Sequence, residues 1–264
     1  MIVLLAEVFC LNLAVGIAGA LLVLCPEDLE PKFFRVNGII ATVLVVVAFF
    51  LLRATGEYSI SNGVSGLSVL LLLYSSLVIR LPRGLERAGL GCAIVWGGSI
   101  LWELLSMSME KGMFLRVADF IAVLSGGWLL GLALVAMNVG HWYLSAVKLS
   151  IRPLRNTTLF LGGVLIFRTL WLAIGLPVLS RMFPAVSADL ELFFRMEEIT
   201  NLSIGMIRVL FGLIGPLILT YMTWETVKLH ATQSATGILY ALLAMVLVGE
   251  ASAFFVTLTT HVPA

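Results

Sequence analysis

The chain has 264 residues, of which 61% are hydrophobic and 12% are charged, and its formal net charge is +1. A soluble domain averages about 45–50% apolar and about 25% charged residues, so this chain has too little polar surface to cover a water-soluble globule. The near-neutral charge gives no reason to expect nucleic acid as a partner. The lipid bilayer is therefore the expected surrounding for most of the chain.

Apolar runs of about 20 residues, the length that crosses a bilayer, predict eight helices. They fall at residues 2–25, 37–54, 63–82, 86–107, 117–147, 157–180, 199–224 and 235–260. The first run has no basic segment before it and no small-residue cleavage site, so it is expected to be a retained helix rather than a signal peptide. Because most connections are short, sequential helices should be antiparallel neighbours. We predict an all-α, polytopic membrane protein whose residues 1–264 form one helical bundle, with no visible internal repeat.

Basic residues predict the orientation of this bundle, because lysine and arginine favour the cytoplasmic side. One side is expected to hold Lys32, Arg35, Arg80, Arg83, Arg87, Lys148, Arg152, Arg155 and Lys228. The other side is expected to hold Arg53, Lys111, Arg116, Arg181 and Arg195. The first side is thus expected in the cytoplasm of a bacterial-type inner membrane, with both termini outside.

The connection over residues 184–198 differs from the others because it is amphipathic. Leu190, Phe193 and Phe194 share one helical face, and acidic residues lie elsewhere. Such a segment is typical of a helix lying in the membrane interface, with Ser187 as its N-cap. It is expected either to brace the bundle or to dock a partner.

The ionisable side chains inside the predicted spans include four acids and two arginines, and a charge costs about 2.5–3.5 kcal/mol at the bilayer centre. They are Glu7, Glu103, Asp119, Arg168, Arg208 and Glu250. Under the predicted topology the four acids fall in the outer half and the two arginines near the midplane, so the six are expected to form one layer. Arg168 and Arg208 are expected to balance the charge of Glu250 and of the other acids.

Small residues share helical faces with several of these charges, which would let neighbouring helices approach closely. In the seventh predicted helix the face is Asn201, Gly205, Arg208, Gly212 and Gly215. In the fifth it is Asp119, Gly126, Ala133, Met137 and Gly140, and in the fourth it is Cys92, Trp96, Ser99 and Glu103.

Buried ion pairs are a weak source of stability, so this cluster has several interpretations. It could lock helices together without any chemistry. Its surplus of acids could provide a protonatable carboxylate and a proton path, or bind a cation. The two arginines could instead hold an anionic group.

A second candidate site lies near the cytoplasmic end of the fifth helix, at Asn138, His141, Trp142 and Tyr143. Aromatic and basic residues are common at this depth for reasons of lipid contact alone. His141 could nevertheless hydrogen-bond a quinone carbonyl, relay a proton or ligate a haem iron, with His230 as the one candidate partner on the same side. Quinone or haem is accordingly the expected cofactor, if there is one.

Three function classes fit these features. The favoured expectation is a membrane subunit of an energy-converting, electron-transfer complex, which would supply a quinone pocket or proton path while partner subunits carry the redox centres. The alternatives are a secondary transporter with a mid-membrane Glu/Asp–Arg site and a purely structural subunit. The chain has no phosphate-binding loop, no dinucleotide fingerprint, no HExxH and no GxSxG, and its three cysteines form no metal or disulfide pattern. The sequence does not decide whether the chain is an enzyme.

Overall fold

The computed structural model describes residues 2–24, 28–56, 58–80, 82–108, 112–145, 150–184, 186–188, 191 and 198–260. These residues form helices and contain no strand. Eight of the helical segments are long and apolar enough to cross a membrane, which confirms the predicted all-α, multi-pass architecture. Most of the segment 184–198 lies outside the described residues, as do Lys111, Lys148 and Arg195.

The first five spans are α1 (Ile2–Val23), α2 (Pro31–Thr55), α3 (Tyr58–Leu77), α4 (Arg83–Ser108) and α5 (Met113–Ser145). The sixth span joins α6 (Arg152–Leu170), the π-helical turn η1 (Trp171–Gly175) and α7 (Leu176–Met182). The seventh joins α9 (Glu198–Val209), the π-helical turn η2 (Leu210–Ile214) and α10 (Gly215–Lys228). The eighth is α11 (Thr232–Thr260).

Several helices start earlier than the apolar pattern predicted, and two of them, α2 and α6, contain a proline in their first turn. Pro31 is the first residue of α2, and Pro153 is the second residue of α6. Proline is favoured there because its fixed φ suits a helix and its missing N–H has no intrahelical acceptor at that position. Polar first turns thus extend these helices beyond their apolar runs.

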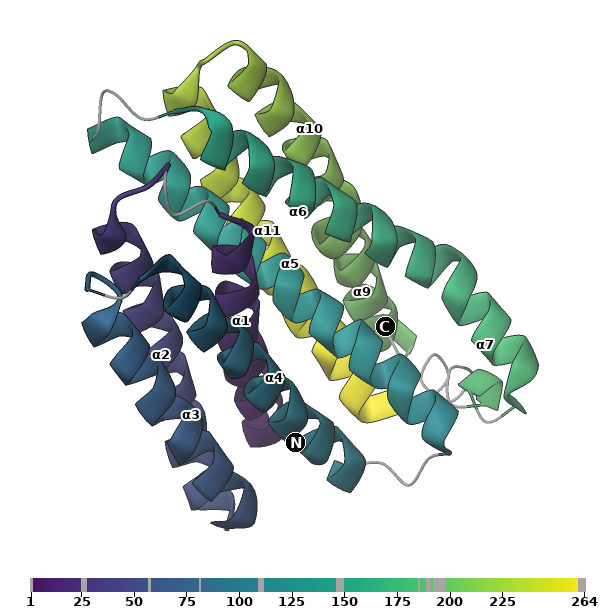
Figure 1. Ribbon diagram of the computed structural model, residues 1–264. Helices are drawn as coiled ribbons and strands as arrows, with labels where there is room; N and C mark the ends of the chain where they lie inside the picture. Colours follow the sequence, from purple (N-terminus) through teal and green to yellow (C-terminus); the bar gives the residue numbers. More distant parts are fainter. Residues whose placement is uncertain are drawn as a thin grey trace.

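The helices fall into two groups that lie side by side, α1–α4 and α5–α11, and the contact between α1 and α5 joins them (Figure 1). Helix α1 begins and α11 ends at the same end of the bundle (Figure 1), which we call the N-terminal end. Helix α5 also begins there, so it runs parallel to α1 and antiparallel to α11.

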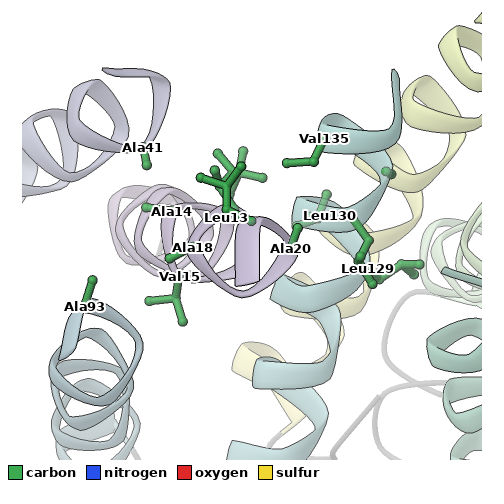
Figure 2. Close-up of a cluster of buried hydrophobic side chains, with 14 of the residues drawn as sticks. Leu13, Ala14, Val15, Ala18, Ala20, Ala41, Ala93, Leu129, Leu130 and Val135 are labelled. Atoms are coloured by element: carbon green, nitrogen blue, oxygen red, sulfur yellow. The ribbon is translucent and has the colours of Figure 1, made fainter. Parts of the chain in front are cut away.

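Helix α1 is buried on nearly all sides, as expected for a helix that is apolar around its whole circumference. Its small side chains let its neighbours approach: Ala14 and Ala18 lie near Ala41 of α2 and Ala93 of α4 (Figure 2). On another side, Ala20 lies beside Leu130 of α5 (Figure 2).

The contact between α1 and α5 is a close crossing of two backbones at glycines. A methyl group on Gly131 would collide with the carbonyl carbon of Gly16, and one on Gly16 would collide with the carbonyl oxygen of Gly127. One turn earlier, the Asn12 side-chain amide donates a hydrogen bond to the Val123 carbonyl. These contacts fix the register in which the two groups of helices meet.

A second polar contact links the groups at the opposite end of α5. The Asn138 amide donates to the Asn37 side-chain oxygen of α2 over 2.8 Å, and Asn37 in turn donates to the Phe33 carbonyl over 2.9 Å. Such bonds inside membrane proteins stabilise by about 0.6 kcal/mol on average.

We therefore expect Asn138→Ala to lower the free energy of unfolding by about 0.6–1.7 kcal/mol, measured by unfolding in detergent micelles. The control is Asn62→Ala on α3, where the lost hydrogen bond to Arg53 is exposed. An equal or larger loss in the Asn62 variant would show that the Asn138–Asn37 bond contributes nothing specific.

Candidate functional site

Two guanidinium groups share one carboxylate inside the bundle. Arg168 Nη2 lies 2.7 Å from Glu250 Oε2, and Arg208 Nη1 lies 3.1 Å from Glu250 Oε1. The exposed fractions are 2% for Arg168, 4% for Arg208 and 0% for Glu250. We call these three residues the charged triad; the sequence predicted the pairing of Glu250 with both arginines, and the structure brings the three together.

Glycines on three helices make room for the triad. A methyl group on Gly126 of α5 would collide with Glu250 Oε2, and one on Gly249 of α11 would collide with the Cα of Gly212 in η2. At Gly212, an added methyl would lie about 2.5 Å from Arg208 Nη1. The predicted small-residue faces of the fifth and seventh helices therefore do meet α11 at the charges.

The contacts of Gly126 and Gly140 define the antiparallel register of α5 and α11. Gly126 faces Glu250, and Gly140, fourteen residues later, faces Thr236, fourteen residues earlier. The same antiparallel register places Asp119 opposite Thr257. Asp119 and Thr257 are both 1% exposed, and seven helical residues separate each from the triad level, a rise of about 10 Å.

Arg168 also bonds to α5. Its Nη1 donates to the Ala122 carbonyl and to Ser125 Oγ, each over 2.7 Å. The Nε atoms of Arg168 and Arg208 are buried and have no hydrogen-bond partner among the described residues. With two arginines and one glutamate, the triad has a formal charge of +1.

Each arginine is followed by an interruption of its helix. The π-helical turn η1 starts three residues after Arg168, and η2 starts two residues after Arg208. Pro177 and Pro216 follow these turns, and the ring of a proline clashes with the carbonyl four residues earlier in a regular helix. Those carbonyls belong to Ala173 in η1 and Gly212 in η2, so the wider π turns relieve the clash.

The sequence signal for this pair of interruptions was missed. Residues 168–175 read RTLWLAIG and residues 208–215 read RVLFGLIG, so arginine, leucine, an aromatic residue, isoleucine and glycine recur at the same spacing. Proline follows each segment within two residues. No internal repeat was visible in the helix-length pattern, and this similarity is confined to two eight-residue segments.

The six predicted charges do not all lie at one level. Glu7 is 2% exposed and accepts a hydrogen bond from Thr55 Oγ1 over 3.3 Å. Since Asn12 contacts Val123 and Gly127, the parallel register puts Glu7 near the level of Asp119, about two turns from the triad. The predicted single layer is thus a triad plus two buried acids nearer the N-terminal end.

The prediction that Glu103 belongs to a buried layer of charges is wrong, because Glu103 is exposed. Helix α4 buries Leu101, Leu104 and Leu105, and Glu103 points to the other side. Cys92, Trp96 and Ser99, which share its face, are exposed as well. The helical spacing identified a common face correctly, but apolar neighbours alone could not show that it faces outward.

The residues of the second predicted site have partners that pin helices together. Asn138 bonds to Asn37, as described above, and the Trp142 ring meets the Phe33 ring edge-on at 5.7 Å. The Tyr143 hydroxyl donates to the Ser150 carbonyl. These contacts give Asn138, Trp142 and Tyr143 packing roles between α5, α2 and the start of α6.

His141 is exposed on the side of the bundle, and its Nδ1 lies 3.3 Å from the hydroxyl of Tyr240 on α11. His230 adopts a left-handed conformation, with φ of 57°, in the turn that precedes α11. Tyr240 is the ninth residue of α11, so about 12 Å of helix rise separates its level from the start of that helix. This separation argues against a haem held between His141 and His230.

An open and largely apolar groove of about 640 Å³ lies between α5 and α6. It is lined by Ile121, Leu124, Ser125, Trp128, Leu159, Phe160, Gly163, Val164 and Phe167. Ser125 lies in the wall that separates this groove from Arg168, because its hydroxyl accepts the hydrogen bond from Arg168 Nη1. The groove was not predicted, since it depends on how two helices diverge.

Comparisons with known protein families, with curated proteins and with solved structures give no match. Within the described part of the chain, no group of three or more His, Cys, Asp or Glu side chains is arranged to hold a metal ion.

Proposed function

We propose that the chain is a secondary transporter of a small anionic solute, with Arg168 and Arg208 as its solute-binding residues. The observation that supports this most is the charge of the triad, since two buried guanidinium groups share a single carboxylate. Guanidinium groups match the geometry of carboxylates and phosphates. Ionisable residues kept inside a membrane at such cost commonly mark substrate or ion pathways.

The helix interruptions support the same proposal. Transporter sites are typically formed where membrane helices are discontinuous near the midplane, and π turns are frequent at functional sites. Here η1 and η2 follow the two arginines directly. Bending at these turns would change the distance between the guanidinium groups and open the triad to one end of the bundle.

The test is solute uptake into proteoliposomes that contain the purified chain, under an imposed pH gradient. The probes are chloride, phosphate, lactate and succinate. Wild-type protein should take up at least one of them, and Arg208→Gln should slow that uptake about tenfold or more, because a hydrogen bond to a charged group contributes about 1.5–3 kcal/mol.

The matched control is Arg181→Gln on α7, which removes an exposed guanidinium group and should leave uptake unchanged. Folded wild-type protein that moves none of the four anions would contradict the proposal. Uptake that survives Arg208→Gln would place the solute path elsewhere.

A second candidate is the membrane subunit of an electron-transfer complex that binds quinone. The observation in its favour is the groove between α5 and α6, where Trp128, Phe160 and Phe167 offer rings for stacking and Ser125 offers a hydroxyl. An apolar groove with few polar groups is typical of small-ligand sites, and its size suits a quinone head and part of its tail. Redox partners would then supply the electrons.

This candidate predicts that a photoreactive quinone labels α5 and α6 of the purified chain. Gly163 has open space around it, so Gly163→Leu should fill the groove and abolish labelling without disturbing packing. His141→Ala should leave labelling unchanged. Labelling that is lost in His141→Ala and kept in Gly163→Leu would place the quinone near His141, as expected from the sequence, and not in the groove.

A further inference from the structure

We infer that Glu250 is a built-in substitute for the carboxylate of the solute, and that a proton on Glu250 frees Arg168 and Arg208 to bind that carboxylate. Carboxylate and proton would then cross the membrane together. The inference rests on the proposed function and names its substrate class and its coupling ion.

Glu250 is bound by both of its carboxylate oxygens. Each of its two oxygens accepts from a different guanidinium group, at 2.7 Å and 3.1 Å. A carboxylate from outside the protein would be held in the same manner, because a planar guanidinium group presents paired donors to a planar carboxylate. Glu250 thus occupies the position that a carboxylate solute requires.

The space around that position is enclosed by glycines and by the triad itself. Gly126 presents no side chain to Glu250, and the Gly212–Gly249 crossing brings backbones together beside Arg208. The three residues of the triad are at most 4% exposed. One carboxylate fits between the guanidinium groups, so an ionised Glu250 and a bound solute exclude each other.

The charged groups nearest Glu250 are the two arginines. Arg168 on α6 and Arg208 on α9 contact it directly, and α5 presents Ser125 and Gly126 at its level. The next acids are Asp119 on α5 and Glu7 on α1, about two turns towards the N-terminal end. Both are buried, and the level of each lies between that end of the bundle and the level of Glu250.

The exchange balances in charge and in protons. On one side of the membrane, Glu250 gains one proton and the solute carboxylate takes its place on the two guanidinium groups. On the other side, the solute leaves, Glu250 releases the proton, and both ion pairs form again. One proton moves with each carboxylate group that replaces Glu250, so a monocarboxylate crosses without net charge.

The test measures binding of lactate and succinate to the purified chain in detergent, at about pH 5.5 and about pH 8, where lactate stays ionised. Ligand binding is read from the rise in unfolding temperature, with chloride and methanesulfonate as anions that lack a carboxylate. Wild-type protein should bind lactate or succinate at least tenfold more tightly at the lower pH. Glu250→Gln, which resembles the protonated acid, should bind it tightly at both pH values.

Two control variants define the result. Glu225→Gln changes an exposed acid on α10 and should behave like wild type, and Arg208→Gln should bind at neither pH. Equal binding of chloride or methanesulfonate would overturn the assignment to carboxylates. Binding by Glu250→Gln that still strengthens at the lower pH, or that is weaker than in wild type, would overturn the role of Glu250.

A measurement on unmodified protein covers the case in which Glu250→Gln does not fold. Wild-type proteoliposomes with a pH dye inside should acidify by one proton for each lactate taken up, beyond the rate in liposomes without protein. Uptake that depends on Arg208 but brings no proton would overturn this inference and leave the transporter proposal standing. Absence of any Arg208-dependent uptake would overturn both.

Discussion

Glu250→Ala is expected to lower the free energy of unfolding by about 3–5 kcal/mol, because it leaves two buried guanidinium groups without their shared carboxylate. Arg168 would keep its bonds to the Ala122 carbonyl and to Ser125. Arg208 would lose its bond to Glu250 and hold its charge inside the bundle. The measurement is reversible unfolding in detergent micelles.

The control removes all three charges at once, with Arg168→Met, Arg208→Met and Glu250→Leu combined. Replacing a whole buried ion cluster by apolar side chains of similar size is often neutral or stabilising. The triple variant should therefore be about as stable as wild type, and it should take up no anion. A triple variant as unstable as Glu250→Ala would show that the triad is needed for the fold itself.

Gly131→Ala is expected to destabilise the protein by about 1–3 kcal/mol or more, since overpacking of a close contact forces the backbone to move. The added methyl group would collide with the Gly16 carbonyl carbon on α1. That crossing joins the two groups of helices, so the shift would propagate to both. Unfolding temperature and unfolding free energy in micelles are the readouts.

Gly163→Ala provides the matched control for this change. Gly163 lies within a span, as Gly131 does, but an added methyl group would meet open space there. Its stability should change by no more than about 0.5 kcal/mol. Equal losses in both variants would mean that the crossing with Gly16 does not decide the outcome, because helix propensity alone favours alanine over glycine.

The sequence predicted the pairing of Glu250 because an ionisable side chain within a span commonly faces the bundle interior and pairs with another charge. Arg168 and Arg208 were the basic residues near the middle of predicted spans, so the choice of partners was small. The small-residue faces were also predictable, since Gly126 and Gly212 recur at helical spacing with the charges. Hydropathy and helical spacing together therefore carried enough information to predict the triad.

Other features depend on the rotation of each helix about its axis and on the distances between helices, and the hydropathy pattern gives neither. Glu103 shares an apolar run with buried leucines, and nothing in the run shows which side of α4 faces its neighbours. Asn138 and Trp142 were predicted to belong to a ligand site, because amides and aromatic rings are common in such sites. The same groups serve equally well to join helices, which is their role here. The turns η1 and η2 could have been predicted from the repeated RxL segments and their prolines, which helix-length scanning does not detect.

A double-mutant cycle between Arg208 and Glu250 tests most directly whether the buried triad exists as described. The unfolding free energies of Arg208→Gln, Glu250→Gln and the double variant are compared with wild type. We expect a coupling energy of at least about 1 kcal/mol, because residues in one ion-pair network are not additive. The exposed Glu225, paired with Lys228, should show no coupling to Arg208. Losses that add within about 0.3–0.5 kcal/mol for Arg208 and Glu250 would contradict the contact.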